Sequence, residues 1–203
     1  MKGFFLLIMV FCGFCSIQIH AQSNVNFKLN TLTYQFSDNN INLAKLKLSN
    51  NGKLAFEPGF IFAYEAFATP TTSLKINMAA LMDKAGKFAG FPQVLIRFRL
   101  FNAFKHSMTF GVGPAFYFRQ TWANIDGYET DDVYSGSGSW QYRPVWFSGE
   151  LEYNYYLTKM SNLSISVNLI NPESIGLAIG YKYWISKKPN KRKRGCISCP
   201  SFH

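Results

Sequence analysis

Few side chains in this 203-residue sequence belong to the types that catalyse reactions. A serine hydrolase needs a serine, a histidine that takes its proton and an acid that orients the histidine. Two histidines, His106 and His203, follow the N-terminal segment, and Ser107 comes directly after the first. Neighbouring residues of a β-strand point to opposite faces, which separates His106 from Ser107 in the strand predicted below. A lipid-hydrolysing enzyme is therefore disfavoured and stays an alternative.

Cys196 and Cys199 form one C-x-x-C pair near the C-terminus. The pair is compatible with a disulfide, a redox couple or a metal site completed by His203. A single C-x-x-C without a second ligand pair is weak evidence for a metal, so no metal and no cofactor is predicted. An oxidising compartment favours a local disulfide.

The polar segment 122–143 is the best candidate for a contact with the surroundings. It is acidic and contains a Ser-Gly repeat, but it lacks the ligand spacing of a calcium loop. A solvated surface loop is one interpretation, and a contact with calcium or lipopolysaccharide is the other. The residues assigned to such a contact are Asp126, Glu129, Asp131, Asp132 and Trp140.

The tail 187–194 reads Lys-Lys-Pro-Asn-Lys-Arg-Lys-Arg and explains much of the net charge of +10. Without this tail and Lys2, the chain has 14 cations against 11 carboxylates. The charge is therefore no evidence for nucleic-acid binding. In the periplasm such a tail would be a solvated segment or would bind anionic lipid headgroups, lipopolysaccharide or an acidic partner.

The N-terminus indicates export. Lys2 precedes an apolar run from Phe4 to about Phe14, and the segment from Ser16 to Ala21 follows, with the small Ala21 at a plausible cleavage site. This order is typical of a secretory signal peptide, and the run is too short to span a membrane as a helix. We expect cleavage near Ala21, which would remove Cys12 and Cys15. Both of these cysteines follow a phenylalanine, so lipid modification is not expected.

The elements that must position these groups are strands. Apolar and small or polar residues alternate with period two in eight segments, and such alternation indicates β-structure. The phase slips in the first segment near Asn30, which suggests a β-bulge. The predicted strands are 25–36, 54–68, 73–82, 91–101, 107–121, 144–157, 162–170 and 174–186.

The links between these strands alternate in character. Links 69–72, 102–106 and 158–161 are short, whereas 37–53, 83–90, 122–143 and the proline-containing 171–173 are longer or more polar. Bacterial membrane barrels have short periplasmic turns and longer outer loops. Eight strands would place both ends of the chain on the periplasmic side.

The polar face of the alternation separates a membrane barrel from a soluble one. It carries many Gly and Ala residues with scattered, nearly balanced charges, which suits the crowded interior of a narrow barrel. We predict that these charges form an ion network that plugs the lumen, with Glu65 directly opposite Lys75 on one hairpin. The predicted network comprises Glu57, Glu65, Lys75, Arg97, Arg99, Arg119, Glu150, Glu152 and Lys182.

In this pattern the chain resembles the small outer-membrane β-barrel proteins of Gram-negative bacteria. The resemblance implies an all-β fold, a closed antiparallel transmembrane barrel that contacts outer-membrane lipids. One departure is that 19 residues follow Trp184, where such barrels often end on an aromatic residue. The predicted regions are a signal peptide (1–21), the barrel (22–186) and a disordered basic periplasmic tail (187–203).

A non-enzymatic structural, adhesive or scaffold role is predicted. The alternatives are a narrow solute channel, a lipid-modifying barrel enzyme and a soluble secreted barrel that binds an apolar ligand.

Overall fold

The computed structural model describes residues 22–36, 45–49, 53–128, 134–136, 138–170 and 174–185. Several predictions lie outside these residues: the signal peptide 1–21, the tail 187–203 with Cys196 and Cys199, and the loop acids Glu129, Asp131 and Asp132. Among the described residues there is no helix long and apolar enough to cross a membrane.

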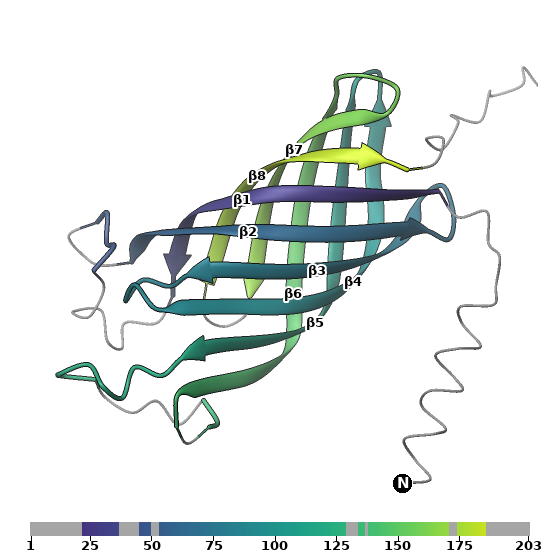
Figure 1. Cartoon of the computed structure of the whole chain (residues 1–203). Coiled ribbons are helices and arrows are strands. Elements are labelled where there is room, and N and C mark those ends of the chain that lie inside the picture. The colour runs from purple at the N-terminus through teal and green to yellow at the C-terminus, as the bar shows by residue number, and fades with distance from the viewer. Residues whose placement is uncertain are drawn as a thin grey trace, which may run out of the picture.

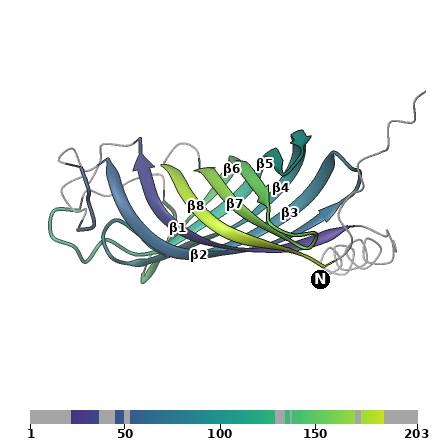
Figure 2. The same ribbon diagram turned by 90° about the horizontal axis from the view of Figure 1, so that it is seen from above.

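Eight antiparallel strands form one closed barrel in which each strand pairs with its neighbour in sequence and β1 pairs with β8. The strands on one wall cross those on the opposite wall obliquely (Figures 1 and 2), as closure of a twisted sheet requires. The strands are β1 (Ser23–Gln35), β2 (Leu54–Phe67), β3 (Thr72–Met82), β4 (Phe88–Ala103), β5 (His106–Gln120), β6 (Trp140–Tyr156), β7 (Ser161–Ile170) and β8 (Ser174–Trp184).

All eight predicted strands are present, and their number, order and closure are confirmed. The pairing of β1 shifts between Asn30 and Leu32 with both neighbours, so the predicted bulge is confirmed as well. β6 begins at Trp140 and not at 144, because residues 140–143 extend the hairpin with β5. The β5–β6 link is correspondingly shorter than predicted.

The two rims of the barrel differ as the link lengths predicted. The short β2–β3, β4–β5 and β6–β7 turns lie at one rim, where β1 begins and β8 ends (Figure 1). The β1–β2, β3–β4, β5–β6 and β7–β8 links lie at the other. We call these the short-turn rim and the long-link rim.

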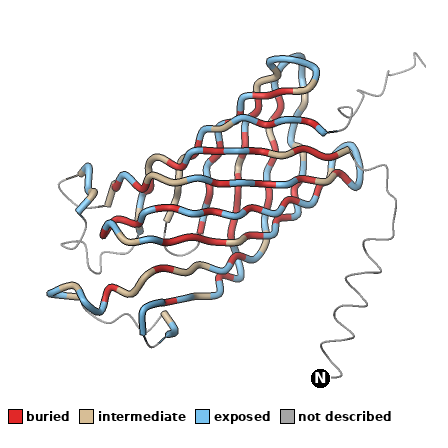
Figure 3. The backbone as a smooth tube through the Cα atoms, in the orientation of Figure 1, coloured by how far each residue is buried: buried red, intermediate tan, exposed pale blue. Residues whose placement is uncertain are grey.

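Burial alternates residue by residue along the strands (Figure 3), and the large apolar side chains are on the outside. Phe60 is 56% exposed and Met78 is 56% exposed, whereas Lys75 and Arg97 are 0% exposed. A soluble barrel would turn its apolar face inward. The prediction that the apolar face points outward is therefore confirmed.

One face assignment was wrong. Strict alternation over the predicted strand 144–157 assigns Trp146 to the inward face of Glu150 and Glu152 and Val145 to the outward face, but Val145 is 4% exposed and Trp146 is 77% exposed. The cause is a register shift between Gly113 and Ala115 of β5, opposite Val145–Ser148 of β6. This bulge reverses the phase of β6 between its two halves.

Candidate functional site

Seven charged side chains from six strands meet inside the barrel near the short-turn rim. We call them the charge cluster. All are buried, with exposed fractions of 3% or less. They are Lys28 of β1, Glu65 of β2, Lys75 of β3, Arg97 of β4, Glu150 and Glu152 of β6, and Lys182 of β8.

Glu152 is the centre of the charge cluster. Its Oε2 lies 2.6 Å from Lys28 Nζ and 2.7 Å from Lys75 Nζ. Its Oε1 pairs with Lys182 and lies 3.2 Å from Arg97 Nη2. One carboxylate thus joins β6 to four other strands.

The other two carboxylates complete the connections across the lumen. Glu150 bonds Lys28 at 2.5 Å and Lys75 at 2.7 Å. Glu65 bonds Arg97 Nη1 at 2.9 Å and Lys182 Nζ at 3.2 Å. Buried charges are tolerated when their partners and hydrogen bonds are complete. Neutral groups add to these bonds: Asn24 and Ser73 donate to Glu65, Asn26 donates to Glu152, and Lys28 donates to Ser166.

Six of the nine residues in the predicted network lie in the charge cluster, and three do not. Glu57 lies eight residues from Glu65 along β2, about 26 Å at the rise of a strand. Its Oε1 accepts Gln35 Nε2 (3.0 Å) and the Lys84 N–H (3.1 Å). Arg99 lies near the end of β4, at the short-turn rim, and its guanidinium is 5.2 Å from the ring centre of Phe67.

Arg119 also lies outside the charge cluster, near the long-link rim. Its guanidinium sits 4.2 Å from the ring centre of Trp122 and 3.7 Å from that of Tyr134, and its Nε donates to Gln141 at 3.0 Å. Alternation predicts the face of a side chain but not its height in the barrel, and these three residues were grouped by face alone.

Lys28 was missed by the sequence prediction. It shares a face with Asn24, Asn26 and Asn30, and this alternation against Phe27 and Leu29 was visible in the sequence. The phase slip at the β1 bulge made the strand look irregular and hid the lysine.

From the charge cluster toward the long-link rim, the lumen contains first a chain of uncharged polar side chains and then an apolar region. Asn77 donates to Gln93 (2.7 Å), Gln93 to Ser148 (2.8 Å) and Ser148 to the Gly113 carbonyl (2.6 Å), which links β3 to β6 across the inside wall. Beyond this chain lie buried apolar side chains. They are Ile61, Ala79, Leu81, Ala89, Phe91, Ala115, Val145, Ile170 and Ala178.

A cavity of about 30 Å³ lies between these apolar residues and the long-link rim. Glu57, Asn30 and Asn168 are among its lining residues. A volume of this size holds one or two water molecules.

Asp83 of the β3–β4 link and Trp122 of the β5–β6 link meet at the long-link rim, and both are buried. Trp122 Nε1 donates to Asp83 Oδ2 at 2.7 Å, and the other oxygen of Asp83 accepts the N–H groups of Ala85 and Lys87. Burial raises the pKa of Asp83 above its ordinary value, although these hydrogen bonds oppose the shift. We call Asp83, Trp122, Arg119 and Tyr134 the cap.

Three further candidates among the described residues are exposed: Asp126, Trp140 and His106. Asp126 lies in the β5–β6 link, and Trp140 begins β6 with its ring 6.1 Å from those of Phe88 and Phe118. His106 at the short-turn rim contacts Tyr153 through Nδ1, while Ser107 is buried. Among the described residues no group of three or more His, Cys, Asp or Glu side chains is placed to hold a metal ion.

Comparisons with known proteins give no family: no family model matches, and no curated protein is similar in sequence. Solved structures of similar fold include a designed transmembrane β-barrel (TM-score 0.47, 9% identity, 81% of this chain and 95% of that chain). They also include the outer membrane protein OprG of Pseudomonas aeruginosa (TM-score 0.46, 11% identity, 83% and 99%). A third is Ail, the attachment invasion locus protein of Yersinia pestis, in complex with a heparin analogue (TM-score 0.47, 10% identity, 82% and 99%).

Proposed function

We propose that this protein is an outer-membrane β-barrel with a structural, adhesive or scaffold role and a lumen plugged by side chains. The observation that carries the proposal is the inversion of the two faces. The barrel's exterior is apolar and its interior holds the charge cluster. Lipid is the solvent that matches this exterior, and a closed barrel leaves no unpaired strand edge in it.

The plugged lumen favours this role over a solute channel. The charge cluster spans the barrel from β1 to β6, and Arg97, Lys75 and Lys28 are all 0% exposed. An ion crossing the barrel would have to break several of these bonds at once.

An enzymatic role is disfavoured by the position of the histidine. His106 is exposed on the outside of the short-turn rim, and Ser107 next to it is buried. A base that cannot reach its nucleophile does not activate it. The external role then falls to the long-link rim, where Asp126 and Trp140 are exposed.

The membrane location is tested with matched tryptophan variants. We expect the protein to sediment with membranes and, once extracted in detergent, to migrate differently on gels before and after boiling. In bilayers containing brominated lipids, Trp146→Phe should remove more of the quenched fluorescence than Trp122→Phe, because Trp146 is 77% exposed and Trp122 is 2% exposed. Recovery in the soluble fraction without detergent would overturn the proposal.

The plugged lumen is tested separately by conductance. In planar bilayers we expect no steady unit conductance from the wild type. Reproducible unit steps that scale with salt concentration would instead support the narrow channel.

The tail 187–203 remains part of the proposal as a periplasmic segment that binds anionic headgroups, lipopolysaccharide or an acidic partner. Crosslinking from a reactive group placed in this tail would identify what it contacts. Crosslinks to cytoplasmic components alone would contradict a periplasmic tail.

A further inference from the structure

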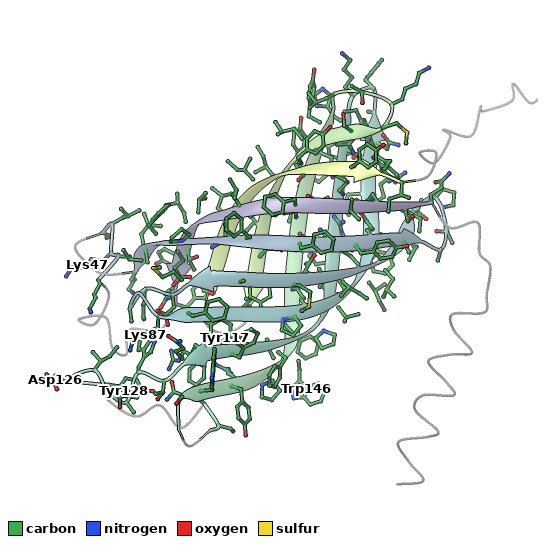
Figure 4. The ribbon with its side chains drawn as sticks, viewed as in Figure 1. Lys47, Lys87, Tyr117, Asp126, Tyr128 and Trp146 are labelled. Atoms are coloured by element: carbon green, nitrogen blue, oxygen red, sulfur yellow. The ribbon has the colours of Figure 1, made fainter. Side chains whose placement is uncertain are left out.

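A cleft on the outside of the long-link rim is lined by both an aromatic side chain and a lysine. It has a volume of about 230 Å³ and is lined by Lys87, Gln120, Thr121, Asn124, Ser139 and Trp140. Lys87 lies beside the links at this rim, whereas Trp146 lies farther along the wall (Figure 4).

Trp140, which lines the cleft, belongs to a group of three aromatic side chains. The rings of Phe88, Phe118 and Trp140 lie 6.1–6.3 Å apart at the ends of β4, β5 and β6. Phe88 is 44% exposed and Trp140 is 46% exposed on the outer face. Aromatic rings at the ends of barrel strands lie where the hydrocarbon meets the headgroups.

The other residues that line the cleft are polar or charged, and hydrogen bonds that involve the backbone hold some of them in place. Gln120 Oε1 accepts the Phe88 N–H at 3.3 Å, and the Ser139 carbonyl accepts the Thr121 N–H at 2.9 Å. The nearby carboxylate of Asp83 accepts hydrogen bonds from Trp122 and two backbone N–H groups, including that of Lys87. Both oxygens of Asp83 are thus occupied by hydrogen bonds, and Asp83 does not line the cleft. Lys87 is the charged residue among those that do.

We propose that this cleft binds the headgroup of a phosphorylated glycolipid. The ammonium of Lys87 would pair with a phosphate, while the amides and hydroxyls beside it would bond the sugar. Trp140 would pack on the sugar ring or on the first carbons of the acyl chains. The inference rests on the proposed outer-membrane location, where the long-link rim would meet the headgroups of the outer leaflet.

The test uses the full mature protein, folded in detergent, with bound lipid measured by native mass spectrometry. The probes are bisphosphorylated lipid A, its dephosphorylated form, phosphatidylglycerol and inorganic phosphate. We expect bisphosphorylated lipid A to bind most tightly. Lys87→Gln should weaken that binding about fivefold, which corresponds to the ~1 kcal/mol of one cation at an anionic lipid surface.

Matched variants separate this cleft from general effects. Lys159→Gln removes an exposed lysine at the short-turn rim. Trp146→Leu removes an exposed tryptophan of β6, the strand that also contains Trp140. Neither should change the affinity, whereas Trp140→Leu should weaken it. Each variant is first checked for a heat-dependent gel shift, which shows that it is folded.

Three results would overturn the inference: equal affinity for dephosphorylated lipid A, equal affinity for phosphatidylglycerol, or full competition by inorganic phosphate. An unchanged affinity of folded Lys87→Gln would do the same. A wild type that needs no detergent to stay soluble would instead contradict the proposed function.

Discussion

Glu65 and Lys75 are register partners on β2 and β3, yet their short ionic contacts cross the lumen in different directions. Lys75 bonds Glu150 and Glu152 of β6, and Glu65 bonds Arg97 of β4 and Lys182 of β8. The directly opposed positions were predicted from the sequence. In a narrow barrel the opposite wall is within reach of a long side chain, so cross-strand neighbours need not be ion partners.

Glu152→Gln should destabilise the barrel by about 3–5 kcal/mol, because the change removes the charge at the centre of the cluster and leaves buried cations uncompensated. Urea unfolding in detergent, followed by tryptophan fluorescence, measures the loss. Asp126→Asn is the control, since Asp126 is exposed and its removal should change the free energy of unfolding by less than about 0.5 kcal/mol. Equal stability of the two variants would contradict a structural role for the charge cluster.

Lys28→Met should cost less than Glu152→Gln, about 1–3 kcal/mol. The charge cluster contains four cations and three carboxylates, so removing Lys28 balances the charges whereas removing Glu152 increases the imbalance. The same unfolding measurement applies to both variants. A larger loss for Lys28→Met would mean that pairing geometry outweighs net charge inside this barrel.

Gly180→Ala should destabilise the barrel by about 1–3 kcal/mol. A Cβ at position 180 would meet the Phe27 carbonyl oxygen at 2.4 Å and the Lys28 side chain and Cα at 2.5 and 2.7 Å, so β8 would be pushed away from β1 and Lys28 would be displaced from its carboxylates. Gly149→Ala is the matched control, because a Cβ there meets nothing closer than 3.6 Å. The temperature at which the folded gel band disappears compares the two. If both variants lose the same amount, the close approach of β8 to Lys28 has no energetic weight.

Asp83→Asn should remove part of the pH dependence of stability. The pKa of Asp83 is raised in the folded state, so folding favours its protonated form. Its contribution is therefore fully present below the unfolded pKa and is lost as the pH rises through the folded pKa. The stability of the wild type relative to Asp83→Asn should therefore fall as the pH rises above the ordinary aspartate pKa of about 3.9. A difference that rises over this range would show that the Trp122 and backbone hydrogen bonds dominate.

Period-two alternation predicted the strands and most of their faces because it is a local property of the chain. It failed where two residues oppose one: the β6 bulge put Val145 inside and Trp146 outside, and the β1 bulge hid Lys28. Whether Glu57, Arg99 and Arg119 join a cluster depends on their height in the barrel. Height follows from the stagger of eight paired strands, which no single segment encodes.

The cap was not predicted for a similar reason. Asp83 and Trp122 belong to different links, and their contact exists only after β3, β4 and β5 have paired. A tryptophan that follows a barrel strand is expected at the membrane interface, but Trp122 is 2% exposed.

The position of Glu152 has a consequence for assembly. Its carboxylate bonds lysines from both the first strand and the last, Lys28 and Lys182. In a barrel that lacks β8, Glu152 and Glu65 both lack their ion pair with Lys182. The lumen is then still open between β1 and β7. Completing the final strand pair therefore also supplies the last ion-pair partner of each of these two carboxylates, so closure of the barrel and completion of the ion pairs occur in the same step.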